Sequence, residues 1–236
     1  MSTADHETRT ALPWLVDGER LDRATFHDRY AAMPERMRAE LIGGVVYIMA
    51  SPLGLRHGRS DAYAVFWLGY YGPFTPGTEV LDNASVFFED YGKHQPDVVI
   101  RILPDHGGRT FDVGGYYSNG PELIVEVSDS TLKKDLGLKL ADYERAGVPE
   151  YVVLCMKPPA VRWHQRVDGR LVEVGPDPDG LHRSKVFPGL WLDPVALLAG
   201  DTRRLREVVD LGLATDDHAE FVARLAAAGP QGGGRA

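Results

Sequence analysis

Residues 121–154, PELIVEVSDSTLKKDLGLKLADYERAGVPEYVVL, decide the fold of this chain. Their pattern predicts a strand, a helix and a second strand, separated by turns. The first strand, residues 123–127, is apolar except for Glu126. A carboxylate is rarely buried unless it is paired, so Glu126 requires a cation or a proton at this position.

A second apolar run, residues 97–103, begins with Asp97 and predicts another strand. Consecutive strands often pair, and in an antiparallel pair the start of one strand lies beside the end of the other. Asp97 and Glu126 are therefore expected to approach each other. Side-chain alternation also places Ile124, Glu126 and Ser128 on one face of the sheet.

The helix that follows this strand is expected to bring a lysine beside Glu126. Asp135, Lys139 and Tyr143 are spaced four residues apart and therefore share one helix face. The seven helical residues that end at Lys139 return about 10 Å along the sheet, while the two strand residues after Glu126 advance about 7 Å. The Lys139 side chain is therefore expected to reach Glu126.

The rest of the sequence predicts hairpins and flanking helices. Candidate helices cover residues 25–37, 55–71, 194–198, 202–211 and 216–228, and Thr25 is the expected cap of the first. Candidate strands lie in a Gly-Gly hairpin at 40–49 and at 79–81, 85–88, 151–156, 161–165, 171–174 and 184–187. Residues 104–121 predict a long exposed connection. Since strands and helices alternate only once, the expected fold class is α/β, with a mixed β-sheet flanked by helices.

Length and composition indicate one main domain. The chain has 236 residues, of which 44% are hydrophobic, an ordinary globular fraction. We expect an N-terminal extension over residues 1–24, a main domain over 25–200, and a helical extension with a Gly-rich tail over 201–236. The sequence shows no membrane span and no secretory signal, and its single cysteine excludes an intrachain disulfide. A cytoplasmic protein is expected.

The predicted arrangement of two carboxylates and a lysine has a chemical use. Hard cations such as magnesium bind carboxylate oxygens and keep several waters, and a bound metal activates water and shields a phosphate. A neighbouring lysine can orient the water, help to deprotonate it, or stabilise developing negative charge. This set suits hydrolysis of a phosphodiester. The net charge of −8 argues against a dedicated nucleic-acid binder, although a local basic cleft is compatible with it.

Over roughly residues 25–198 the chain resembles the Uma-type restriction endonuclease family of the PD-(D/E)XK nuclease superfamily. The motifs that carry the resemblance are Pro96-Asp97, residues 121–131, Asp135, Lys139, Tyr143, Gly147–Tyr151, the hairpin that starts at Glu40, His57, and Pro188-Gly189-Leu190. The superfamily pattern has a lysine two residues after the second acid, where this chain has Ser128. Lys139 would then reach the site from the helix.

The resemblance implies a restriction-endonuclease-like fold and magnesium-dependent cleavage of DNA. Asp97, Glu126 and Lys139 are the implied catalytic residues. Asp97 and Glu126 would hold Mg²⁺, or Mn²⁺, and Glu40 resembles an upstream acid that some members add to the metal site. His57, Asp135, Tyr143 and Ser128 are candidate accessory residues. Cutting both strands of a duplex favours two sites related by a two-fold axis, so a homodimer is expected.

Each candidate also has a purely structural interpretation. Glu126 can pair with a structural lysine, Asp97 can shape a turn, and Lys139 can belong to a solvated helix face beside Lys133 and Lys134. Two other functions stay open: a catalytically silent nuclease-fold module that binds protein or nucleic acid, and a hydrolase for small phosphoesters.

Overall fold

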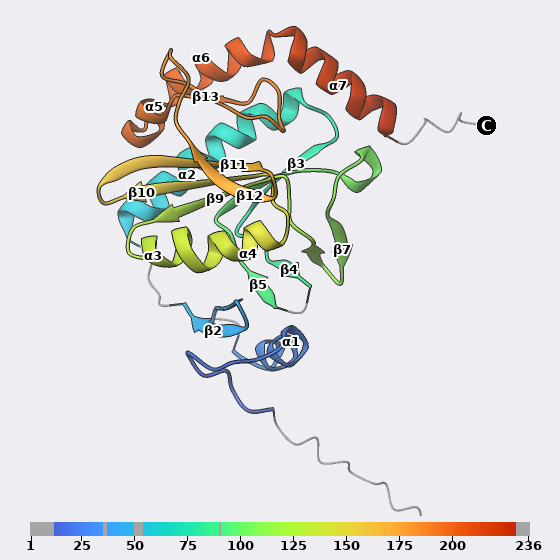
Figure 1. Ribbon diagram of the computed structural model, residues 1–236, viewed down its shortest axis with the longest axis vertical. Helices are drawn as coiled ribbons and strands as arrows, with labels where there is room; N and C mark the ends of the chain where they lie inside the picture. The colour runs from blue at the N-terminus through green and yellow to red at the C-terminus, as the bar shows by residue number, and fades with distance from the viewer. Residues whose placement is uncertain (1–11, 35–36, 50–53, 90, 230–236) are drawn as a thin grey trace, which may run out of the picture.

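The computed structural model describes residues 12–34, 37–49, 54–89 and 91–229. Within them it contains two six-stranded sheets, a two-stranded ribbon and surrounding helices (Figure 1). The α/β class with mixed sheets flanked by helices is confirmed, but there are two large sheets where the sequence predicted one. Residues 1–11 of the expected N-terminal extension, residues 35–36 of the first predicted helix and residues 230–236 of the expected tail lie outside the described residues. The division into domain and extensions stays a prediction.

The first large sheet contains the organising strand–helix–strand unit. Its strand order is β12-β11-β10-β9-β6-β3, with bounds β3 Thr78–Asp82, β6 Val98–Ile102, β9 Leu123–Ser128, β10 Glu150–Met156, β11 Pro159–Val167 and β12 Arg170–Val174. β9 and β10 are parallel, whereas the other neighbours in this sheet are antiparallel. Because parallel neighbours need a crossover, the helix between β9 and β10 is required by the topology.

The second large sheet uses short strands. Its order is β2-β1-β5-β4-β8-β7, with bounds β1 Ala39–Ile42, β2 Val45–Ile48, β4 Val86–Phe88, β5 Gly92–His94, β7 Phe111–Val113 and β8 Tyr116–Ser118. The hairpin predicted at 40–49 is present as β1 and β2. The prediction of an exposed connection at 104–121 is wrong, because this segment contributes β7 and β8 and buries Tyr117.

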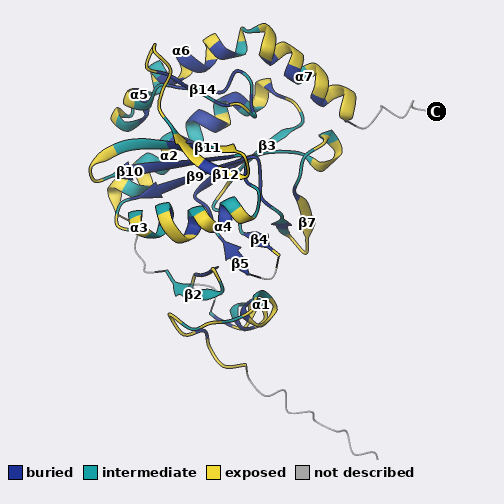
Figure 2. Cartoon of the chain, viewed as in Figure 1, coloured by how far each residue is buried: buried dark blue, intermediate teal, exposed yellow. Residues whose placement is uncertain are grey.

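Helices cover both faces of the first sheet (Figures 1 and 2). Their bounds are α1 Arg23–Ala31, α2 Leu55–Tyr71, α3 Leu132–Lys134, α4 Leu140–Arg145, α5 Pro194–Ala199, α6 Thr202–Leu213 and α7 Asp216–Ala228, with the π-helical segment η3 Asp135–Lys139 between α3 and α4. The short 3₁₀ turns are η1 Gly72–Phe74 and η2 Pro104–His106, and the ribbon pairs β13 His182–Arg183 with β14 Trp191–Leu192. No described helix is long and apolar enough to cross a membrane.

Two sequence predictions fail for local reasons. The first helix begins at Arg23, because the side chain of Asp22, and not Thr25, caps it, and it ends at Ala31. Residues 184–187 are not a strand. The Ser184 hydroxyl accepts hydrogen bonds from the N–H groups of Val186 and Phe187, so a side chain competes with strand pairing for these backbone groups.

Side-chain alternation along β9 decides what each face contacts. Leu123, Val125 and Val127 pack in the core cluster that contains α2, whereas Ile124 packs in the cluster that contains α4. Glu126 shares the face of Ile124, as the sequence predicts. Its carboxylate is therefore buried beneath the crossover helix.

Candidate active site

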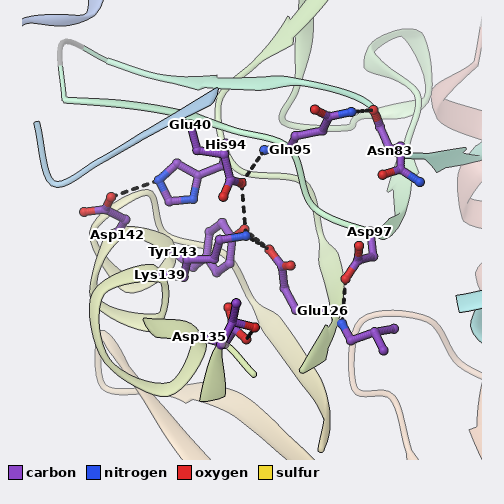
Figure 3. A network of polar contacts seen from close by, with 12 residues as sticks. Glu40, Asn83, His94, Gln95, Asp97, Glu126, Asp135, Lys139, Asp142 and Tyr143 are labelled. Carbon is purple, nitrogen blue, oxygen red and sulfur yellow. Dashed lines mark hydrogen bonds and ion pairs between the residues drawn. The ribbon is translucent and has the colours of Figure 1, made fainter. Parts of the chain in front are cut away.

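The two predicted acids lie side by side. β6 and β9 are antiparallel, and Val98 is the register partner of Val125, so Asp97 and Glu126 occupy the next positions in register. Oδ2 of Asp97 accepts a hydrogen bond from the Val127 backbone N–H at 2.6 Å. The expected approach of the two carboxylates is confirmed, and Figure 3 shows both carboxyl groups facing the same space.

The crossover helix contains a widened turn where it passes Glu126. Residues 135–139 are π-helical, and π-helical turns are frequent at functional sites. Asp135 and Lys139, at the two ends of the turn, are both buried, whereas Leu138 beside them is 47% exposed. The widened turn therefore directs one aspartate and one lysine into the protein.

Lys139 joins two carboxylates in the protein interior (Figure 3). Its Nζ lies 2.8 Å from Oε1 of Glu126 and 3.0 Å from Oε1 of Glu40. The Tyr143 hydroxyl donates to the same Glu126 oxygen at 2.6 Å, and the Gln95 backbone N–H donates to Oε1 of Glu40 at 2.9 Å. The predicted approach of Lys139 to Glu126 is confirmed.

Burial and charge determine the protonation of this cluster. Burial raises the pKa of Glu126 well above its usual range, although the Lys139 ammonium opposes the shift. Burial also disfavours the ionised Glu40, but Lys139, His94 and the Gln95 N–H together hold the pKa of Glu40 below its usual value. Burial would lower the pKa of Lys139, yet its carboxylate neighbours raise it instead. Lys139 therefore remains an ammonium group.

An outer layer of contacts fixes the Glu40 hairpin to the crossover helix. Oδ2 of Asp142, in α4, accepts a hydrogen bond from the Gly43 backbone N–H at 2.7 Å and lies 2.9 Å from Nε2 of His94. His94 and Asp142 are 48 residues apart, and the sequence analysis did not identify Asp142, His94 or Gln95. The nearest sequence signal was the position of His94 three residues before Asp97.

Of the accessory candidates, His57 and Asp135 lie at the site itself, whereas Tyr143 and Ser128 lie behind it or beside it. Nε2 of His57 lies 3.4 Å from Oδ1 of Asp97, and this carboxylate raises the pKa of His57. Burial raises the pKa of Asp135, whose Oδ2 accepts a hydrogen bond from the Thr131 hydroxyl. Tyr143 is fully buried behind Glu126. Ser128 points to the start of the helix, with its Oγ 3.4 Å from that of Thr131.

These side chains border a cavity of about 390 Å³. The lining residues are Glu40, Ile48, Met49, Gly54, His57, Gln95, Asp97, Glu126, Val127, Asp129, Ser130, Thr131, Lys134, Asp135 and Lys139. Every predicted catalytic residue is among them. The two accessory candidates that do not line the cavity are Ser128 and Tyr143. The cavity therefore brings together residues from β1, β2, α2, β9 and the crossover helix.

The donor set fits a hard cation held by two carboxylates. No group of three or more His, Cys, Asp or Glu side chains in the described part of the chain is arranged as a metal site. Glu40 shares its Oε1 between Lys139 and Gln95. Magnesium, however, is commonly bound by one or two carboxylates together with water and substrate phosphates. Asp97 and Glu126 are such a pair, because the hydrogen bonds of Glu126 with described residues all go to Oε1 and leave Oε2 for a ligand.

One solved structure shares the fold of this chain, and one family profile matches its sequence. No curated protein matched the chain. A crystal structure described as "a putative nuclease belonging to DUF820 from Anabaena variabilis ATCC 29413" matches with a TM-score of 0.53 and 14% sequence identity, covering 77% of this chain and 97% of that one. This likeness establishes a shared fold. A family profile described as "Uma2: Putative restriction endonuclease" matches residues 24–196. The match confirms the resemblance seen in the sequence and supports a nuclease, and the chain belongs to the Uma2 family.

Proposed function

We propose that this protein is a metal-dependent endonuclease that hydrolyses phosphodiester bonds of DNA. The observation that carries the proposal is the convergence of Asp97, Glu126 and Lys139 on one cavity, in a chain of the Uma2 family. Neither the fold nor the family assigns a role to any residue, so the roles given below rest on contacts and chemistry.

Asp97 and Glu126 would hold Mg²⁺, or Mn²⁺, where β6 begins and β9 ends in the first sheet. A bound cation supplies an activated water and shields the charge of the phosphate. Asp97 is fixed for this role because the Val127 N–H holds one of its oxygens. Glu126 is fixed by Lys139 and Tyr143, which both bind Oε1. Because hydrogen bonds already hold both carboxylates in place, their side chains need little rearrangement when an ion binds.

Lys139 fits a positioning and charge-stabilising role. Its ammonium group has three donors, and two are directed at Glu126 and Glu40. The remaining donor can bind a phosphate oxygen or the attacking water. A buried ammonium that is already oriented stabilises developing negative charge without further rearrangement.

The test is cleavage of supercoiled plasmid DNA with magnesium by wild type, Glu126→Gln and Asp97→Asn. We expect each substitution to lower the cleavage rate by at least about 100-fold, since an effect of several kcal/mol on the transition state corresponds to such a factor. Glu220→Gln, at an exposed glutamate of α7, is the matched control and should cleave like wild type. Equal cleavage by wild type and Glu126→Gln would reject the assigned site.

Calorimetric titration with magnesium or manganese separates this proposal from a catalytically silent module. An endonuclease site should give binding heat that disappears in Glu126→Gln. A vestigial site should give no heat that depends on the carboxylates. The expected homodimer is tested separately by sedimentation of the full chain.

A further inference from the structure

A second cluster of charges lies at the edge of the same cavity. Asp129 lines the cavity, three residues after Glu126. Its Oδ1 lies 3.4 Å from an Arg56 guanidinium nitrogen and 3.4 Å from Nζ of Lys157. Arg56 belongs to the first turn of α2 and Lys157 follows β10. Two cations from distant parts of the chain therefore face one carboxylate at the cavity edge.

The carboxylate holds these cations loosely. Charge-assisted hydrogen bonds are usually about 2.7–2.9 Å long, which is shorter than either contact. The Oδ1 atom of Asp129 is buried and has no hydrogen-bond partner. The side chains of Arg56 and Lys157 are 55% and 57% exposed. Ion pairs at such exposure are weak, so an anion with better geometry can displace the carboxylate.

The surroundings of Asp129 also favour an anion. Gly54 is the N-cap residue of the 17-residue helix α2, and no side chain caps this end. Oδ2 of Asp129 lies 3.9 Å from the position that a Cβ on Gly54 would take. The Asp129 carboxylate thus lies against an uncapped helix N-terminus, where N–H groups and the helix dipole attract negative charge.

We propose that Arg56 and Lys157 form a phosphate-binding site and that Asp129 occupies the position of the phosphate in the free protein. The inference rests on the proposed nuclease function and specifies its substrate. Three extended residues span at most about 10 Å, and phosphates of one strand follow each other at about 3.4 Å along the helix axis. The bound phosphate is therefore within about three nucleotides of the scissile one, and the substrate is a polynucleotide strand rather than a small phosphodiester.

The test measures DNA binding without cleavage. The full chain is titrated into a short fluorescein-labelled DNA duplex in EDTA, and the fluorescence anisotropy is followed over a range of KCl concentrations. Arg56→Ala and Lys157→Ala should each raise the Kd about 5-fold and lower the slope of log Kd against log salt by about 1. Asp129→Asn should lower the Kd, because it removes the competing negative charge and keeps the side-chain size.

Arg203→Ala is the matched control, since Arg203 is an exposed arginine of α6 that contacts none of these residues. It should bind like wild type. Unchanged Kd and salt slope in both cation variants, weaker binding by Asp129→Asn, or no binding by wild type would each overturn the inference. Because EDTA removes the metal, an inactive nuclease that still gives the predicted shifts would refute the proposed function and leave this site standing.

Discussion

Two buried lysines, Lys139 of the crossover helix and Lys93 of the second sheet, have different surroundings. These surroundings shift their pKa values in opposite directions. Lys139 is 4% exposed and contacts two carboxylates, whereas Lys93, in β5, is 2% exposed and contacts aromatic rings. The Nζ of Lys93 lies 3.4 Å from the ring centroid of Tyr30 and 5.2 Å from that of Tyr116. No described carboxylate pairs with Lys93.

The pKa values of the two lysines show what the carboxylates contribute. Burial lowers the pKa of Lys93 to about 8. Burial acts in the same direction on Lys139, but Glu126, Glu40 and Asp135 reverse it and raise the pKa. A lysine at the cavity could have served as a base if it were buried like Lys93. The pair of glutamates at Lys139 instead keeps a permanent positive charge beside the proposed metal site.

The largest expected effect comes from removing the charge of Lys139. Lys139→Met keeps the length of the side chain but leaves Glu40 and Glu126 as neighbouring buried carboxylates. Breaking a buried ion pair from one side costs about 3–5 kcal/mol, so the free energy of unfolding should fall by that amount in urea titrations at pH 7. The double variant Lys139→Met/Glu126→Gln should recover part of the loss. A single variant as stable as wild type would show that the cluster is not held by charge.

A smaller effect is expected at Tyr143, whose hydroxyl donates to Glu126. Tyr143→Phe removes a hydrogen bond to a buried carboxyl oxygen and should lower the free energy of unfolding by about 2 kcal/mol. Tyr30→Phe is the matched control on the other lysine. It keeps the ring face that Lys93 contacts and should change stability by no more than about 0.5 kcal/mol. Equal losses in the two variants would contradict the contrast between carboxylate and aromatic surroundings.

The sequence predicted those parts of the site that depend on the pattern of neighbouring residues. The pairing of β6 with β9 follows from two consecutive apolar runs, and the position of Lys139 opposite Glu126 follows from rises per residue. The widened turn at residues 135–139 could not be predicted, because the apolar spacing also fits an ordinary α-helix. The strands at 111–113 and 116–118 are too short for a periodic signal.

The contacts that the second sheet makes with the site were also not predicted. Glu40 meets Gln95 across 55 residues, and His94 meets Asp142 across 48. Both contacts require the second sheet, whose existence the sequence pattern did not reveal. The sequence therefore predicted which residues are chemically unusual, whereas the structure supplied the partners that determine their charge.

The smallest expected effect is at Lys93, and its sign depends on pH. The folded pKa of about 8 lies below the ordinary 10.5, so between these values the unfolded chain binds more protons and stability rises with pH. The cost of the charged Lys93 is fully present below about pH 8 and disappears above about 10.5. Contacts with the aromatic rings offset part of it.

Lys93→Met should therefore raise the free energy of unfolding by about 1 kcal/mol at pH 7, after the cation–π contacts are discounted. The gain should shrink as the pH rises and vanish above about pH 10.5. Urea titrations of wild type and variant at a series of pH values measure both. A variant that is less stable than wild type at pH 7 would mean that the rings stabilise the ammonium more than burial destabilises it, and the two lysines would then differ only in the identity of their partners.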